Sequence, residues 1–180
     1  FKVIKLIDGA IAVESPENML LKPEQWYGAI YYDMVTTEDK TNTYYTLLGY
    51  RPNNSTHNEK VLEVLSLKTA NNIRFGAKIF NTPLINSIKY KRPPYRLIFR
   101  YNPKSVASVK YVPSQKRIVM DHLAVPDASM KENWAAYGPD FSYHALFWED
   151  GQWQLEDEID VKNNINPTEP QPTQKGLPKK

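Results

Sequence analysis

The stretch from Phe141 to Val161 reads FSYHALFWEDGQWQLEDEIDV and constrains the fold more than any other part of the chain. Asp150-Gly151 at its centre predicts a two-residue type I′ turn, because both central residues of that turn need positive φ angles. Counting outward from the turn puts four large apolar side chains on one face, as the facing pairs Trp148 with Trp153 and Leu146 with Leu155. We therefore expect a β-hairpin whose register is fixed by one buried face.

Short strand-like segments follow one another along the rest of the chain, at 26–35, 43–51, 59–68, 72–80, 95–101, 105–112 and 116–123. Regular spacing of this kind with turn-rich connections is typical of all-β folds. It predicts a mainly β protein, either a single antiparallel β-sandwich or an open barrel of meander type. One segment, Asp127 to Tyr137, predicts a short helix with Asp127 or Ser129 as its N-cap.

The 180 residues suffice for one sizeable domain. We expect an N-terminal extension at 1–25 with a short hairpin near its start, a β-rich domain at 26–161 and a Pro-rich tail at 162–180. Such a tail is extended unless the domain or a partner holds it. Its prolines are candidate partner contacts, namely Pro167, Pro170 and Pro172.

Composition narrows the function classes. The chain has no Cys, which excludes disulfides and Cys-ligated zinc. Seven Gly against twelve Tyr argues against Gly-rich nucleotide loops, and no apolar run approaches the ~18 residues of a membrane span. We expect no cofactor, no metal and no transmembrane segment. The chain begins at Phe1, which fits removal of a signal peptide or a boundary of the sequence, and both alternatives stay open.

The segment from Lys89 to Lys104 carries six basic residues and no acid. Strand alternation predicts that its aromatic rings face the core and that its arginines face outward, so the rings are not placed to stack on bases, and we expect no nucleic-acid partner. The segment either pairs with the acidic hairpin or steers an acidic protein or glycan. The candidate binding residues are Lys91, Arg92, Arg96 and Arg100.

Aromatic residues crowd the first strands of the predicted sheet. Adjacent tyrosines such as Tyr31 and Tyr32 must place one ring on each face of a strand. Some of these rings therefore lie outside the core or beneath another layer. Trp26, Tyr31 and Tyr45 are candidate residues of a glycan-binding or peptide-binding surface, and packing between layers is the alternative.

Two histidines have a carboxylate within reach in the predicted strands. His144 faces Asp157 across the hairpin, and His122 follows Asp121. A carboxylate can hold an imidazole in one tautomer, as acid–base chemistry requires. Neighbours two apart on a strand are about 7 Å apart, so Ser142 is too far from His144 to be activated by it. We expect no catalytic residues here but plain surface pairs. Asp121, His122, Asp140 and His144 are the four possible metal ligands, and their spacing matches no known metal-ligand pattern.

Several blocks of the chain resemble a family of small exported proteins of gliding-type Bacteroidota, whose activity is uncharacterised. They are TYYTLLGYR (43–51), KVLEVLSL (60–67), NIRFGAKIF (72–80), RLIFRY (96–101), KRIVMDHLAVP (116–126) and YGPDFSYHALFWEDGQWQLEDEIDV (137–161). The resemblance implies a place in the cell envelope, in the periplasm or at the periphery of the outer membrane. It supplies no catalytic residues.

Together these features lead us to expect a non-enzymatic accessory protein of the envelope. It would bind another envelope protein through its sheet surface and its tail, as a subunit of an outer-membrane or secretion-linked complex. One alternative is a glycan-binding or peptide-binding β-domain. Another is a hydrolase that uses a His/Asp site.

Overall fold

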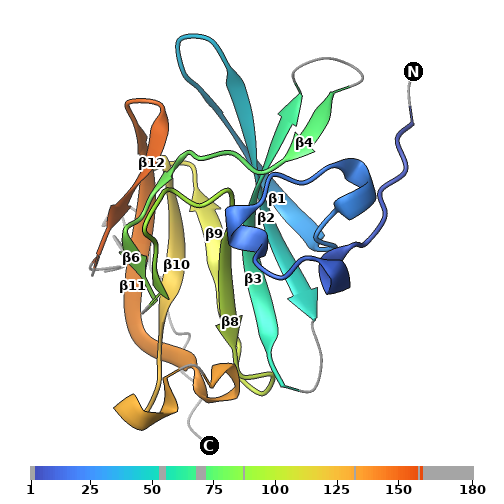
Figure 1. Ribbon diagram of the computed structural model, residues 1–180. Coiled ribbons are helices and arrows are strands. Elements are labelled where there is room, and N and C mark those ends of the chain that lie inside the picture. The colour runs from blue at the N-terminus through green and yellow to red at the C-terminus, as the bar shows by residue number, and fades with distance from the viewer. Residues whose placement is uncertain are drawn as a thin grey trace, which may run out of the picture.

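The computed structural model describes residues 3–52, 56–67, 72–86, 88–131, 133–157 and 159. Their strands form two five-stranded sheets and one separate two-stranded hairpin (Figure 1). The two large sheets pack face to face around a shared core. The prediction of a mainly β sandwich is confirmed.

The first sheet has the strand order β1-β2-β3-β4, with β8 also paired to β3. Its strands are β1 (Ile30–Glu38), β2 (Thr43–Pro52), β3 (Asn58–Leu67), β4 (Ile73–Phe75) and β8 (Leu97–Tyr101). β4 pairs with the end of β3 and β8 with its beginning, so both lie along the same edge. All pairings in this sheet are antiparallel.

The second sheet has the order β5-β12-β11-β10-β9. Its strands are β5 (Phe80–Asn81), β9 (Val109–Val112), β10 (Arg117–Ala124), β11 (Gly138–Glu149) and β12 (Gln152–Glu156). β5 and β12 run parallel, and the other pairs are antiparallel. The prediction of one strand at 72–80 is wrong, because the chain leaves the first sheet after β4 and enters the second at β5. Gly76 lies at this break with a φ of +110°, where a side chain is strained.

The predicted hairpin is present as β11 and β12. Asp150 and Gly151 have φ angles of 51° and 78°, as a type I′ turn requires. The expected pairs from Glu149 with Gln152 to Ala145 with Glu156 all occur. Trp153 is buried and lies edge to face with Trp148 at 5.4 Å between ring centroids. The apolar face of this hairpin therefore closes one side of the core.

The main core lies between the two sheets. The first sheet contributes apolar side chains such as Leu48 and Leu62, and the second contributes Ile118, Leu146 and Trp153. Full burial of an aliphatic or aromatic side chain stabilises the fold by about 1.5–3 kcal/mol. This core holds β10 and β11 rigidly side by side, and these two strands carry both histidines of the site described below.

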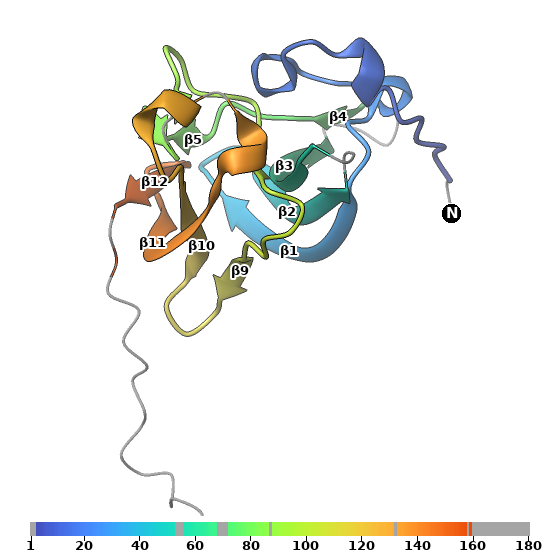
Figure 2. The same cartoon turned by 90° about the horizontal axis from the view of Figure 1, so that it is seen from below.

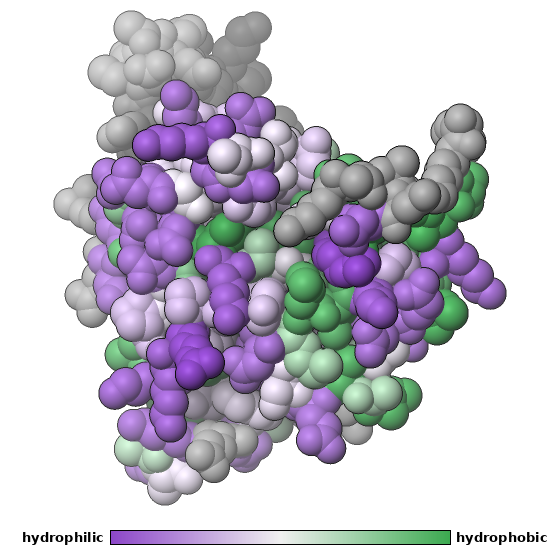
Figure 3. Space-filling view, turned by 45° about the horizontal axis from the view of Figure 1, so that its top comes forward, coloured by the Kyte–Doolittle hydropathy of each residue, from purple (hydrophilic) through white to green (hydrophobic). Residues whose placement is uncertain are grey.

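Residues 10–29 pack along the outer face of the first sheet (Figures 1 and 2). They contain three single 3₁₀ turns, η1 (Ala10–Ala12), η2 (Pro16–Asn18) and η3 (Pro23–Gln25). A second apolar cluster joins the segment to the sheet through Val13, Leu21, Tyr27, Ala29, Val61, Phe75 and Ile98. Figure 3 shows hydrophobic residues gathered on the side of the molecule that carries this segment.

The short hairpin expected near the start of the chain is wrong for the described residues from 3 to 13. Asp8 forms a bridge with Trp26 instead, and the chain then turns at Ala10–Ala12. The pairing partner is thus distant in sequence, which local apolar runs do not reveal.

The continuous helix predicted from Asp127 to Tyr137 is also wrong. Two separate 3₁₀ turns are present, η4 (Ala128–Met130) and η5 (Trp134–Ala136). Asp127 and Asn133 each cap one turn through a side-chain acceptor, and Lys131 between them has a ψ of 142° that no helix contains. No helix in the described ranges is long and apolar enough to span a membrane.

Candidate functional site

A pocket of about 280 Å³ lies where β10 and β11 meet the small hairpin of β6 (Leu84–Ile85) and β7 (Ile88–Lys89). We call it the two-histidine pocket. It is lined by Leu84, Ile85, Asn86, His122, Asp140, Ser142, His144 and Asp157. The sequence predicts three of these as acid–base candidates, His122, His144 and Asp157. The structure brings these three together.

His122 lies opposite a bulge in β11. Asp121 pairs with Tyr143 and Leu123 pairs with Pro139, so His122 alone faces three residues of β11, Asp140 to Ser142. Its Nδ1 lies 2.7 Å from Oδ2 of Asp140. Asp121, the neighbour that sequence suggests as the partner, instead accepts a hydrogen bond from the Ser108 backbone N–H at 2.7 Å.

The Asp140 carboxylate is itself held in place. Its Oδ1 accepts hydrogen bonds from the Ser142 hydroxyl at 2.7 Å and from the Ser142 backbone N–H at 3.1 Å. Partial burial acts to raise the pKa of Asp140, but the hydrogen bonds from Ser142 and His122 together outweigh burial, so the pKa is lowered. Asp140 is therefore ionised at neutral pH and fixes the orientation of the His122 ring.

His144 forms the second imidazole–carboxylate pair. Its Nδ1 lies 3.0 Å from Oδ1 of Asp157, as the hairpin register predicts. The His144 side chain is buried, whereas that of Asp157 is mostly exposed. The rings of His122 and His144 meet edge to face with centroids 4.8 Å apart. Two imidazoles, each with a carboxylate oxygen within 3.0 Å of its Nδ1, thus share one pocket.

Asn86 is a pocket residue that sequence reasoning missed. It is only 4% exposed, and its Oδ1 accepts a hydrogen bond from the Leu123 backbone N–H at 3.0 Å. Because a backbone N–H needs an acceptor, this bond fixes which side of the amide carries oxygen. The buried Nδ2 donor has no partner among the described residues. An unpaired buried donor costs about 1–3 kcal/mol, so its presence at a pocket points to a bound ligand or an ordered water.

The backbone at the pocket is strained in two places. Among described non-Gly residues, four have positive φ angles, and two of these, Lys116 and Asp150, lie in turns between strands. The other two are Asn86 with a φ of 47° and Phe141 with a φ of 70°. Phe141 lies between Asp140 and Ser142 and is 91% exposed. A left-handed aromatic residue costs roughly 1–3 kcal/mol, and such strain is typical of functional sites.

A metal ion is not what the pocket suggests. Three of the four residues weighed as metal ligands, His122, Asp140 and His144, do lie together, and Asp121 does not. Within the described part of the chain, no group of three or more His, Asp or Glu residues has an arrangement that could hold a metal. The carboxylates face the imidazole Nδ1 atoms instead, which suits hydrogen bonding and proton transfer.

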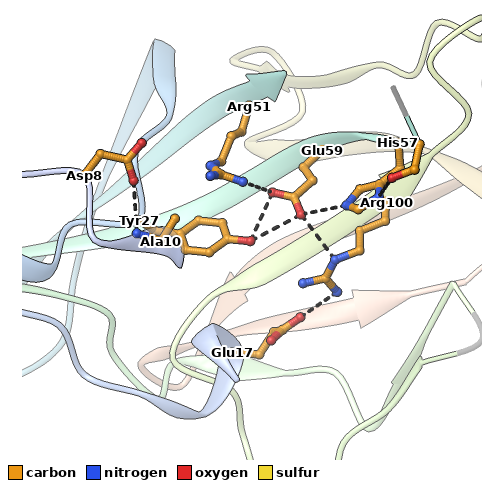
Figure 4. A network of polar contacts seen from close by, with 9 residues as sticks. Asp8, Ala10, Glu17, Tyr27, Arg51, His57, Glu59 and Arg100 are labelled. Carbon is orange, nitrogen blue, oxygen red and sulfur yellow. Dashed lines mark hydrogen bonds and ion pairs between the residues drawn. The ribbon is translucent and has the colours of Figure 1, made fainter. Parts of the chain in front are cut away.

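A second polar cluster lies under the N-terminal segment (Figure 4). Its centre is Glu59, which is 1% exposed and accepts a hydrogen bond from the Tyr27 hydroxyl at 3.0 Å. Arg51 approaches the same carboxylate at 3.5 Å and Arg100 at 3.2 Å. Arg100 also binds Glu17 of the N-terminal segment at 2.9 Å.

Arg96 lies in the same layer and is fully buried. Its Nε donates to Glu63 at 2.7 Å, and its other nitrogens donate to the carbonyl oxygens of Phe75, Met19 and Pro16. The prediction that Arg96 faces solvent is wrong, because the N-terminal segment covers this face of the sheet. We call Arg96, Glu63, Glu59, Arg51, Arg100 and Glu17 the buried ion network.

The expected pairing between the basic segment and the acidic hairpin is also wrong for Arg96 and Arg100. Both bind acids of the buried ion network, and the hairpin residue Glu156 pairs with Arg117 at 2.9 Å. The structure does bring the candidate binding residues Lys91, Arg92 and Arg100 together. They line a hollow of about 450 Å³ in which the Arg100 guanidinium lies 5.6 Å from the Trp134 ring centroid.

The candidate aromatic surface is largely packed. The Trp26 indole N–H donates to the Tyr31 hydroxyl at 2.9 Å, and both rings pack against the second apolar cluster. Tyr45 is half-buried in β2 opposite Leu65. Trp26 and Tyr31 therefore pack between layers of the fold, which is the alternative to a binding surface. The tail candidates Pro167, Pro170 and Pro172 lie outside the described residues.

Comparison with known proteins adds no relative. A scan against family models, a search of curated proteins and a search of solved structures each return no match for this chain.

Proposed function

We propose that the protein is a glycan-binding β-domain and that the two-histidine pocket holds one end of the glycan. The observation that carries this proposal is the buried Asn86 amide, whose Nδ2 donor has no partner among the described residues. A ligand oxygen that enters the pocket satisfies this donor and removes the cost of leaving it unpaired.

The kinds of side chain at the pocket favour a sugar. Sugar hydroxyls both donate and accept, and the pocket offers a donor in Asn86, acceptors in Asp140 and Asp157, and imidazoles that do either. Phe141 lies between the lining residues Asp140 and Ser142 in the chain and is exposed, and we propose that its ring packs on the apolar face of the sugar. The strain at Phe141 is then the cost of presenting that ring.

A glycan-binding role without catalysis fits the envelope location that the resemblance implies. The accessory role in an outer-membrane or secretion-linked complex stays a prediction, because it depends partly on the tail at 162–180. Deleting 163–180 and repeating a pull-down from native membranes tests it. Loss of the same envelope protein from the pull-down supports the accessory role, and an unchanged set of bound proteins contradicts it.

A glycan array followed by calorimetric titration tests the proposal. The array is probed with the full chain, and the strongest glycan is titrated into the wild type and into Asn86→Asp. This variant keeps the acceptor for the Leu123 N–H and removes the Nδ2 donor. We expect at least a tenfold loss of affinity, since it loses a hydrogen bond and gains a buried charge.

Gln115→Glu is the matched control. It makes the same amide-to-acid change at an exposed turn residue at the other end of β10. Its affinity should equal that of the wild type. Equal affinities for all three proteins, or no glycan bound at all, contradict the proposal.

Hydrolysis is the second candidate function, and the 2.7 Å contact between His122 and Asp140 favours it. A carboxylate-oriented imidazole can take a proton from a water that attacks a bound substrate, with the Asn86 amide as a donor to the developing oxyanion. Ester, phosphodiester and glycoside substrates test this. Turnover that His122→Gln abolishes without loss of glycan affinity establishes it, and binding without turnover removes it.

A further inference from the structure

A second hollow of about 190 Å³ lies along the segments that flank the β6–β7 hairpin. It is lined by Asn81, Thr82, Pro83, Tyr90, Lys91, Arg92 and Pro93. None of these residues lines the two-histidine pocket. It is therefore separate from the pocket that we propose to bind a glycan.

Two hydroxyl groups of this hollow are buried and unpaired. Thr82 is 2% exposed, and its Oγ1 has no hydrogen-bond partner among the described residues. The same is true of the Tyr90 hydroxyl. Burial raises the pKa of Tyr90, so this hydroxyl stays protonated and keeps its proton for donation. Two unpaired donors at one cavity point to an acceptor that the cavity receives.

The charge of the hollow is positive. Lys91 and Arg92 are exposed, and neither belongs to an ion pair among the described residues. No carboxylate lines the hollow. Glu17 lines the neighbouring, larger hollow, to which Tyr90, Lys91 and Arg92 also contribute. Its charge adds to burial in raising the pKa of Tyr90, and its carboxylate is bound to Arg100 at 2.9 Å. The hollow therefore offers two hydroxyl donors and two cations that have no ion-pair partner among the described residues.

We propose that this hollow binds a tetrahedral oxyanion, a sulfate or phosphate group of a ligand. The hydroxyls of Thr82 and Tyr90 donate to its oxygens, while Lys91 and Arg92 balance its charge. A guanidinium offers paired N–H donors that match the oxygens of such a group.

Calorimetric titration with sodium sulfate and with sodium phosphate tests this, against sodium chloride at equal ionic strength. The wild type should bind sulfate or phosphate saturably and chloride not. Tyr90→Phe and Thr82→Val remove one hydroxyl each at nearly constant shape. We expect each to weaken oxyanion binding at least fivefold, and Arg92→Ala to weaken it more, because a charge-assisted hydrogen bond is roughly twice as strong as a neutral one.

Stability separates a ligand site from a structural one. Because the Tyr90 hydroxyl has no partner to lose, Tyr90→Phe should leave the midpoint of urea unfolding without oxyanion unchanged or higher. A lower midpoint with unchanged sulfate affinity means that the hydroxyl serves the fold, and it overturns the proposal. A sulfate response equal to that in chloride overturns it as well.

The charge-matched control is Lys40→Ala combined with Lys110→Ala, which removes two exposed lysines on other strands or turns. It should bind sulfate as the wild type does. If it weakens sulfate binding as much as Lys91→Ala combined with Arg92→Ala, net charge alone is responsible and the site does not exist. Asn86→Asp should leave sulfate binding unchanged, so this site can fail or succeed independently of the glycan proposal.

Discussion

The buried ion network and the two-histidine pocket are both polar and partly buried, but they differ in how completely their groups are paired. In the network, the Arg96 guanidinium bonds to one carboxylate and three backbone carbonyls, and Glu59 receives a hydroxyl and several cations. In the pocket, an amide donor is left over and two residues have strained backbones. Full pairing is what a structural role requires.

This difference distinguishes polar groups that stabilise the fold from polar groups that are available to a ligand. The network joins the N-terminal segment to the first sheet, because Glu17 and the carbonyls of Pro16 and Met19 belong to that segment. In the pocket, the Asn86 Nδ2 donor forms no hydrogen bond that links two parts of the described structure. We therefore expect substitutions in the network to change stability and substitutions in the pocket to change binding.

Arg96→Met should have the largest effect. It leaves Glu63 buried without its cation, and breaking a buried ion pair in this way costs about 3–5 kcal/mol. Urea unfolding followed by Trp fluorescence measures the loss. The double variant Arg96→Met with Glu63→Leu removes both charges and should recover most of it. A single variant as stable as the wild type would show that the network does not hold the segment.

Phe141→Gly should have a smaller effect of opposite sign. Relief of the left-handed strain outweighs the backbone entropy that glycine adds to the unfolded state, for a net gain of about 1 kcal/mol. Affinity for the glycan should fall at the same time. Val106→Gly is the control, since Val106 is equally exposed but has no positive φ angle. Val106→Gly should lower the free energy of unfolding by about 0.5–1 kcal/mol. A loss of stability in both variants contradicts the strain assigned to Phe141, and an unchanged affinity of Phe141→Gly contradicts its assignment to binding.

The pH dependence from Asp140 should be the smallest effect. Its pKa is lower in the folded state than in the unfolded state, where it is about 3.9. The stability that this contributes is fully present above pH 4 and is lost as pH falls through the lowered folded pKa. Asp140→Asn should therefore lose stability less steeply than the wild type below pH 4. Asp33→Asn, an exposed carboxylate on β1, serves as control, and identical acid profiles for all three proteins would refute the prediction.

The sequence predicts those features that depend on local rules. The β11–β12 register follows from one turn and from strict alternation around Trp148 and Trp153, and both are contained within twenty residues. The contact between His144 and Asp157 follows from the same register. Local alternation and turn residues likewise predict the approximate positions of most other strands.

Features that depend on distant contacts were not predictable. Arg96 has the alternation of an outward-facing residue, and it is buried only because the N-terminal segment packs over it, about eighty residues away in sequence. His122 contacts Asp140 because Asp140 lies in a bulge of β11 that faces it, and no local pattern marks that bulge. The unpaired Nδ2 donor of Asn86 can be recognised only from the fold, in which the distant Leu123 backbone N–H donates to Asn86 Oδ1.

The most direct test of the central claim is an NMR titration of the ¹⁵N-labelled protein with the glycan selected on the array. If the two-histidine pocket is the site, the Asn86 side-chain amide resonances and the imidazole resonances of His122 and His144 shift together and saturate with one dissociation constant. Resonances of the buried ion network stay in place. Shifts confined to residues outside the pocket, or Asn86 amide resonances that do not move at saturation, would contradict the claim.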